Sequence, residues 1–468
     1  MKQSRPISIR PRLGSALIAV LVAGLLLGAL FFLVSCGTPP GDDTTTSTSN
    51  GVTTSTTGSA SHDDALLAAS DLSRVSALAP RADILSASGA VDAFGADLYG
   101  VLAQTAGDGN LVFSPASIVT ALAMTYAGAV GPTADEMAKT LHFGLQGDAL
   151  HQAFNSLDSL LESRSWQGKD SEGKDQGVLV KTANSLWAQK DLPFERLFLD
   201  TLAADYGAGV RLVDYRTAAE DARETINDWV AGQTEDKIKD LIPQGALDEL
   251  TRLVLVNAVY LDATWAYQFD KDMTTDGQFT TLAGSAVTTP MMSQSAGFAY
   301  GMGEGWEAVE LPYARDELSM LLIVPQQGRF AEVEGQLKNG LLDEVIGGLS
   351  NDAEVDLTMP KFKFRTQAGL ADALKALGME KAFDPEAADF SGMTKQEALY
   401  VSDVIHEAYI AVDEEGTEAA AATAVIMRAT AAPLTMVQMK VDRPFLFALR
   451  DRDTGAILFL GRVTDPTA

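Results

Sequence analysis

The sequence predicts an α+β fold with large sheets and several helices, formed by one domain that spans residues 86–468. Helix-like and strand-like patterns are mixed along this whole stretch. It contains neither a low-complexity break nor an internal repeat that would separate a second domain. With 46% hydrophobic and 21% charged residues, the chain has an ordinary globular composition and can bury a large core.

Three segments are expected to be helical. An apolar stretch at residues 118–126 follows a Ser-Pro pair and ends at glycines. Thr133 and Glu136 have the spacing of a capping box and predict a helix that runs towards Leu141. A third helix ends before Gly378, because three leucines recur there at helical spacing, namely Leu370, Leu374 and Leu377.

Strands are expected between and after these helices. Residues 253–261 are apolar and β-branched and predict a central strand, in which Asn257 is a buried polar group that needs a partner. The apolar alternation changes parity at Pro360, which indicates a bulge or a change of neighbouring strands. Residues 404–412 predict another strand, and 441–463 predict two strands around a turn.

The N-terminus has the features of a secretory signal over residues 1–35. A basic start precedes an apolar run, and small residues lead to Cys36, the only cysteine of the chain. This arrangement resembles the bacterial lipoprotein signal, which implies a lipid on Cys36; the alternative is an uncleaved membrane anchor. Residues 36–85 are expected to form a linker, of which 37–62, rich in Ser, Thr and Gly, is a flexible stalk and 63–85 is a transition into the folded domain. We therefore expect the folded domain outside the cytoplasm, tethered to the cell envelope.

The charge and the motifs exclude several classes of function. The formal net charge is −28, and removal of the four basic residues in 1–35 takes it to −32. Such acidity argues against nucleic-acid binding through a general electrostatic field. The four histidines lack zinc-site spacing, and no Gly-x-Ser-x-Gly motif is present. We expect no metal site, no cofactor and no catalytic residues.

Residues 413–433 show a pattern that fits two conformations. One face of an extended chain carries only uncharged, compact or apolar residues, which are Thr417, Ala419, Ala421, Thr423, Val425, Met427 and Ala429. The other face carries the charges Glu418 and Arg428. The segment could enter a sheet, yet alanine favours helices over strands. Its sequence indicates a segment that is exposed in one state and inserted in another.

Four groups of motifs, in order along the chain, resemble the serpin family over residues 86–467. The third group reads Glu-Glu-Gly-Thr-Glu-Ala-Ala-Ala-Ala, and the fourth reads Val-Asp-Arg-Pro-Phe-Leu-Phe. The four groups are 110–118 with 127–137, 255–260 with Trp265, 414–422, and 441–447.

The resemblance implies a single serpin domain with a large central sheet, further sheets, about eight to nine helices and an exposed reactive-centre loop. The implied hinge of that loop is Glu414, Glu415, Gly416, Thr417, Glu418, Ala419, Ala420, Ala421 and Ala422. The implied polar shutter beneath the sheet consists of Asn110, Ser114, Ser117, Asn257 and His406. Trp265 and Lys361 are implied to lie in the breach region at the top of the sheet. Lys361 and Glu414 would form an exposed ion pair, worth only ~0–1 kcal/mol.

The implied activity is suicide inhibition of an extracellular serine or cysteine protease by a monomeric protein. The protease cuts the loop, and the loop then inserts into the central sheet and traps the acyl-enzyme. Family spacing places the cut between Thr430 and Ala431, which suits an elastase-like or subtilisin-like enzyme. Arg428, which suits a trypsin-like enzyme, and Met427 are alternatives. The alternative function is that of a non-inhibitory serpin, which acts as a binding or carrier protein.

Overall fold

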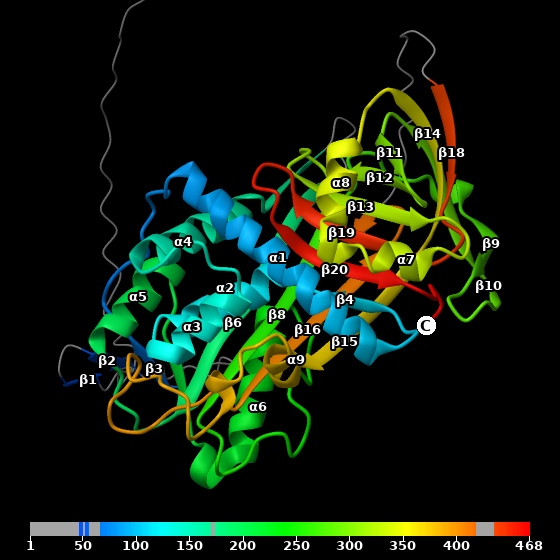
Figure 1. Cartoon of the computed structure of the whole chain (residues 1–468). Coiled ribbons are helices and arrows are strands. Elements are labelled where there is room, and N and C mark those ends of the chain that lie inside the picture. Colours follow the sequence, from blue (N-terminus) through cyan, green and yellow to red (C-terminus); the bar gives the residue numbers. More distant parts are fainter. Residues whose placement is uncertain (1–45, 50–51, 56–65, 170–172, 174, 418–434) are drawn as a thin grey trace, which may run out of the picture. The chain divides into compact units, whose positions relative to one another are not determined.

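The computed structural model describes residues 46–49, 52–55, 66–169, 173, 175–417 and 435–468, all within one compact unit. These residues form three sheets and nine α-helices, which confirms the expected α+β fold (Figure 1). No helix within these ranges is long and apolar enough to cross a bilayer.

The central sheet has ten strands. In spatial order they are β1 (Thr46–Ser49), β2 (Val52–Ser55), β3 (Leu66–Ala69), β7 (Val210–Val213), β6 (Asp175–Gln189), β8 (Leu253–Thr264), β17 (Gly416–Thr417), β16 (Asp403–Val412) and β15 (Phe362–Gly369), with β5 (Trp166–Lys169) paired to one end of β6. The expected central strand is β8, in which nearly every residue is buried.

Two smaller sheets complete the β-structure. One contains β18 (Thr435–Lys440), β14 (Ala353–Pro360), β10 (Ala286–Ala296) and β9 (Thr275–Thr280). The other contains β11 (Ala299–Gly303), β12 (Trp306–Pro312), β13 (Leu318–Pro325), β19 (Phe445–Asp451), β20 (Ile457–Val463) and β4 (Leu111–Phe113). Pro360 ends β14, and Phe362 begins β15 in the central sheet, so the parity change marks a change of neighbouring strands.

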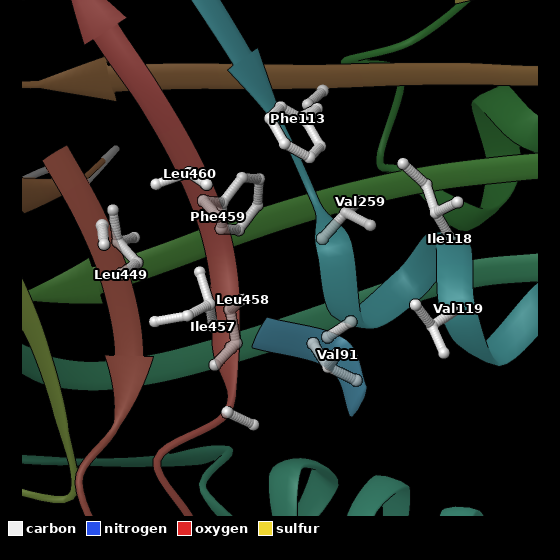
Figure 2. Packing of buried hydrophobic residues seen from close by; sticks show 14 of the residues in the cluster. Val91, Phe113, Ile118, Val119, Val259, Leu449, Ile457, Leu458, Phe459 and Leu460 are labelled. Atoms are coloured by element: carbon white, nitrogen blue, oxygen red, sulfur yellow. The ribbon is translucent and has the colours of Figure 1, made fainter. Parts of the chain in front are cut away.

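The helices are α1 (Arg81–Ala106), α2 (Pro115–Tyr126), α3 (Gly131–Thr140), α4 (Asp148–Ser163), α5 (Arg196–Tyr206), α6 (Tyr215–Gln233), α7 (Phe330–Glu334), α8 (Leu341–Gly348) and α9 (Ala371–Ala376). The main core joins α1 and α2 to the central sheet and to the six-stranded sheet. Figure 2 shows Val91 of α1, Ile118 of α2, Val259 of β8 and Phe459 of β20 within this cluster.

The start of α3 differs from the expected capping box. The helix begins at Gly131, so Thr133 lies inside its first turn rather than at the cap. Its hydroxyl accepts instead from the backbone N–H of Asp389 at 2.9 Å, and Glu136 accepts from that of Lys381 at 2.8 Å. Both side chains make tertiary contacts instead of capping the helix, and the fixed φ of Pro132 favours the helical conformation of the first turn.

The folded structure also begins earlier than residue 86. Helix α1 starts at Arg81, and β3 pairs with β7 of the central sheet. Strands β1 and β2 extend this pairing within the stretch expected to be linker. Composition did not indicate this, because an open sheet edge can bind a short segment through backbone hydrogen bonds alone.

Candidate functional site

The candidate site lies where the hinge enters the central sheet. The two residues of β17 sit between β8 and β16, with Gly416 opposite Thr264 and Thr417 opposite Ala263. A Cβ on Gly416 would lie 2.0 Å from the carbonyl oxygen of Ala263, so only glycine permits this approach. The hinge therefore begins as an inserted strand of two residues.

Beyond β17, the two flanking strands pair directly with each other. Residues 403–408 of β16 run parallel to residues 254–259 of β8. Any further insertion after Thr417 requires β8 to separate from β16 along this length. The remaining hinge residues and the proposed reactive bond lie outside the described residues, as does Cys36; they are Glu418, Ala419, Ala420, Ala421, Ala422, Met427, Arg428, Thr430 and Ala431.

Thr417 is held by an aromatic pair. Its side chain is buried, and its hydroxyl lies 2.6 Å from that of Tyr313. The Tyr313 ring stacks on Trp265 with centroids 4.6 Å apart, and the Trp265 indole N–H donates to the carbonyl of Asp413 at 3.0 Å. Tyr313 was not expected from the sequence; it follows β12 and reaches the hinge only through the fold. The stacked rings of Tyr313 and Trp265 therefore limit the size of the side chain that can occupy the position of Thr417.

Two lysines neutralise the buried carboxylates that precede β17. Lys361 donates to Glu414 at 2.7 Å, and Thr274 donates to the other oxygen of that carboxylate at 2.8 Å. Glu415 receives a hydrogen bond from Lys271. Glu414 and Glu415 are only 3% and 2% exposed, so the expectation of an exposed pair at Glu414 was wrong. The reason is that the bend before β17 is held against the molecule, because the backbone N–H groups of Phe269 and Trp265 donate to the carbonyls of Glu414 and Glu415, each at 2.9 Å.

The local electrostatics follow from this burial. Burial alone would raise the pKa of Glu414, but the hydrogen bonds from Lys361 and Thr274 outweigh it, and the pKa is lowered. Burial raises the pKa of the neighbouring Asp413, whose carboxylate accepts from the backbone N–H of Glu415 at 2.9 Å. The hydrogen bond to Glu415 raises the pKa of Lys271. Two ion pairs, Lys361–Glu414 and Lys271–Glu415, therefore hold the hinge and favour the ionised forms of Glu414 and Lys271.

Beneath the sheet, a polar cluster joins α2 to three strands. We define the shutter cluster as Ser114, Ser117, Asn184, Asn257 and His406. The Ser117 hydroxyl donates to the Asn184 amide oxygen at 2.7 Å and accepts from the Asn257 amide at 2.5 Å. Asn184 and Asn257 stand opposite each other on β6 and β8. The cluster connects both strands to the N-terminal end of α2.

His406 links this cluster to β16. Its Nε2 accepts from the backbone N–H of Ser114 at 3.2 Å, so Nδ1 carries the proton and donates to the amide oxygen of Asn257. Burial lowers the pKa of His406 to about 3, and the ring is neutral at physiological pH. Asn257 and His406 are opposite each other in the paired part of β8 and β16. They stand where the sheet must open for insertion.

The structure brings four of the expected shutter residues together and leaves one apart. Asn110 lies instead at the end of the six-stranded sheet, where its side chain bonds to the backbone of Thr464 and Asp465. Asn184 takes part in the cluster but was not expected. The sequence around Asn184 did not mark it as a buried residue, because polar residues are common in partly exposed strands such as β6. Its role is evident only from its position opposite Asn257 on β8.

The sequence of the chain is similar to a known family over most of its length. The family model described as Serpin (serine protease inhibitor) matches residues 89–466. A serpin-like protein of Thermococcus kodakarensis is 38% identical over 380 residues, covering 81% of this chain and 85% of the relative. Human leukocyte elastase inhibitor is 37% identical over 382 residues, with 80% and 97% covered.

A solved structure shares both sequence and fold with the chain. Serpin48 of the insect Tenebrio molitor is 30% identical and superposes with a TM-score of 0.70, over 81% of this chain and 98% of that one. The residues that the family model matches include the shutter cluster, the hinge and every strand of the central sheet except β1, β2 and β3. The chain therefore belongs to the serpins, a family of protease inhibitors rather than of enzymes.

Proposed function

We propose that this serpin is a suicide-type inhibitor of extracellular serine proteases. The observation that carries the proposal is the insertion of Gly416 and Thr417 between β8 and β16. A protease that cuts the loop would free its N-terminal part, which could then continue from β17 into the sheet. Continued insertion would replace the direct β8–β16 pairing with pairing on both sides of a new strand.

The loop sequence supports this continuation. Every residue that would face inward from Thr417 to Ala429 is uncharged. No charge would therefore be buried without a partner, which is the largest obstacle to inserting a strand. The fourteen residues from Thr417 to Thr430 would span on the order of 45 Å at about 3.3 Å per residue. An acylated protease would be displaced by more than the diameter of a small domain.

The scissile bond that we propose joins Thr430 to Ala431. The small side chains of these two residues suit an elastase-like or subtilisin-like enzyme. One relative is named leukocyte elastase inhibitor, and another, from mouse, is named antithrombin-III. Cuts after Arg428 or Met427 are the alternative positions. The partner of this monomeric inhibitor is then a protease that it meets outside the cytoplasm.

We also propose that the inhibitor is tethered to the cell envelope by a lipid on Cys36 after removal of residues 1–35. Detergent phase separation of the expressed protein should place it in the detergent phase, and the Cys36→Ala variant should move to the aqueous phase. If the variant stays in the detergent phase, an uncleaved apolar anchor explains the tether instead. Mass spectrometry of the N-terminal peptide distinguishes the two forms.

Incubation with elastase, subtilisin and trypsin tests the inhibitory function. We expect an SDS-resistant complex with at least one protease and release of a C-terminal fragment that begins at Ala431. The cut protein should also unfold at a higher temperature than the intact protein, because the inserted strand adds sheet hydrogen bonds. Clean cleavage by all three, with no complex and no rise in unfolding temperature, would favour a carrier function and overturn the proposal.

A further inference from the structure

A segment upstream of the family region fastens the edge of the central sheet. We call residues 66–79 the strap. Its first part is β3, whose residues Leu66, Leu67 and Ala68 pair with Leu212, Arg211 and Val210 of β7. The family model begins at residue 89, so the strap is additional to the fold that this model describes.

The strap is held to α4 by one arginine. Arg74 donates to Asn155 at 2.7 Å, to Asp158 at 2.6 Å and to Glu162 at 3.0 Å. These acceptors are spaced so that they share one face of α4. The Arg74 side chain is 24% exposed and that of Asp158 is 20% exposed, so this pair is partly desolvated. It contributes more than an open surface pair does.

Backbone groups of the strap add further contacts. The N–H of Val75 donates to the carbonyl of Ala204 in α5 at 2.8 Å, and its carbonyl accepts from the Asn155 amide at 2.7 Å. The N–H of Ala79 donates to the Ser156 hydroxyl at 2.8 Å. The strap thus connects β7, α5 and α4 before the chain enters α1. Figure 1 shows β3 close to α5 at the start of this path.

The two ends of the strap are attached to parts of the molecule that must move relative to each other. When β8 leaves β16, it carries β6 along, because residues 178–188 of β6 pair with it, and β7 follows through its own pairing with β6. Helix α1 is bound instead to the six-stranded sheet. The Ser88 hydroxyl donates to the carbonyl of Thr454, and Asp92 accepts from the N–H of Ile457 at the start of β20.

From this arrangement we propose that the strap restrains the opening of the central sheet and slows insertion of the uncut loop. Separation of β8 from β16 would pull β7 away from α1, and the strap contacts resist that displacement. The inference rests on the proposed insertion of the loop. Insertion without a cut would also require β18 to leave β14, since the loop ends at β18. Such a molecule could not present its scissile bond to a protease.

The test uses full-length protein in detergent without protease. Arg74→Met removes the link to α4 but keeps an unbranched apolar stem of similar reach. The matched control is Arg81→Met, which breaks the exposed pair with Asp453, 2.9 Å apart, in the first turn of α1. Each protein is warmed below its unfolding temperature. Remaining inhibitory activity and the unfolding temperature are followed with time.

We expect Arg74→Met to lose inhibitory activity several-fold faster than the wild type and Arg81→Met. The product should be a monomer that unfolds at a higher temperature, as an inserted form must. Equal rates in all three proteins would overturn the proposal, and so would loss by aggregation without any heat-resistant product. If Arg74→Met does not fold, Arg74→Lys, which keeps the charge but loses the fork of hydrogen bonds, is measured against the same control.

Protease-cut protein separates the two proposals. If the cut wild-type protein gains no heat resistance, loop insertion itself fails, and the proposed function fails with it. If the cut protein gains heat resistance and Arg74→Met converts no faster than the control, only the strap proposal fails.

Discussion

The hydroxyl of Thr417 lies 2.6 Å from that of Tyr313, inside the central sheet. The first loop residue that would face inward is therefore already buried and hydrogen-bonded. Because Tyr313 in turn stacks on Trp265, the site has a fixed shape that accepts a small polar side chain. Insertion after a cut would therefore continue from Thr417, which already lies between β8 and β16 in the uncut protein.

Replacing Thr417 by Arg should convert the inhibitor into a substrate. The guanidinium would have to enter a buried site or expel β17, and an unpaired buried charge costs several kcal/mol. We expect cleaved serpin and active protease instead of an SDS-resistant complex. Denaturing gels and residual protease activity measure the two outcomes.

Thr417→Ser is the matched control, because it keeps the hydroxyl that bonds to Tyr313. It should still form the complex with little change in stoichiometry. Trapping of protease by Thr417→Arg at the wild-type stoichiometry would contradict insertion as the mechanism.

Replacing Asn257 by Ala should destabilise the intact protein. The change removes the partner of Ser117, Asn184 and His406 at once. Buried polar groups left unsatisfied cost about 1–3 kcal/mol each, partly offset by relaxation. We expect a lower midpoint of urea unfolding, with an unchanged slope, measured by tryptophan fluorescence. Asn339→Ala on the exposed surface should leave the midpoint unchanged, and equal midpoints for both variants would show that the cluster adds no stability.

Local patterns in the sequence were sufficient for part of the secondary structure, namely strands β8, β14, β15, β16, β19 and β20 and helices α2, α3 and α9. The apolar run before and after Asn257 predicted β8. The parity change at Pro360 predicted a bulge or a change of neighbouring strands, and the structure has the change of strands. The capping box at Thr133 failed, because a tertiary contact with Asp389 competes for the same hydroxyl. Short-range rules hold where no distant residue offers a better partner.

The missed parts of the site depend on contacts between distant residues. Tyr313 and Thr417 are far apart in the sequence, and so are Lys271 and Glu415. No spacing rule connects such positions; only the path of the chain does. For Asn110 the error runs the other way. The serpin-like motif predicted it in the shutter, but its side chain bonds to the backbone of Asp465 instead. The pairing of the strap with β7 was not predicted, because backbone pairing requires no particular side chains.

Removing Lys361 should weaken the hinge in a pH-dependent way. In Lys361→Met, the buried Glu414 carboxylate keeps Thr274 but loses its counter-charge. Since Lys361 is 36% exposed, we expect a loss of about 1–3 kcal/mol in the free energy of unfolding near pH 7. The pKa of Glu414 is lowered in the folded wild type, so the pair stabilises the protein above the unfolded pKa and loses its effect as the pH falls.

Urea unfolding at several pH values measures this deficit, which should shrink below about pH 4.5. The double variant Lys361→Met/Glu414→Gln should lose less stability at neutral pH than the single variant, because no unpaired charge stays buried. A deficit that is equal at all pH values would mean that Lys361 acts through packing alone.

The buried histidines should make the protein less stable as the pH falls below 6.5. Burial lowers the pKa of His151 to about 4, and its ring is hydrogen-bonded to the hydroxyl of Tyr206. Between pH 6.5 and 4 the unfolded chain binds a proton that the folded protein does not. The free energy of unfolding then falls by up to about 1.4 kcal/mol per pH unit for each such histidine.

Comparison with His151→Gln isolates the contribution of one histidine. The stability of the wild type relative to this variant should decrease from pH 7 to pH 5, as measured by urea unfolding at each pH. A difference that does not change with pH would show that His151 binds its proton equally well in the folded and unfolded states.

Replacing Asp92 by Asn should stabilise the protein at neutral pH and above. Burial outweighs the hydrogen bond from the N–H of Ile457 and raises the pKa of Asp92 to about 7. Between the unfolded pKa near 3.8 and about 7, the unfolded chain is ionised at this residue while the folded protein is protonated, so wild-type stability falls as the pH rises. Asparagine keeps the acceptor oxygen without the charge. We expect a gain of about 1–2 kcal/mol at pH 8 that disappears below pH 4, measured by urea unfolding, with the exposed Asp108→Asn as control. A loss of stability at pH 8 would instead mean that the ionised carboxylate is favourably placed between α1 and β20.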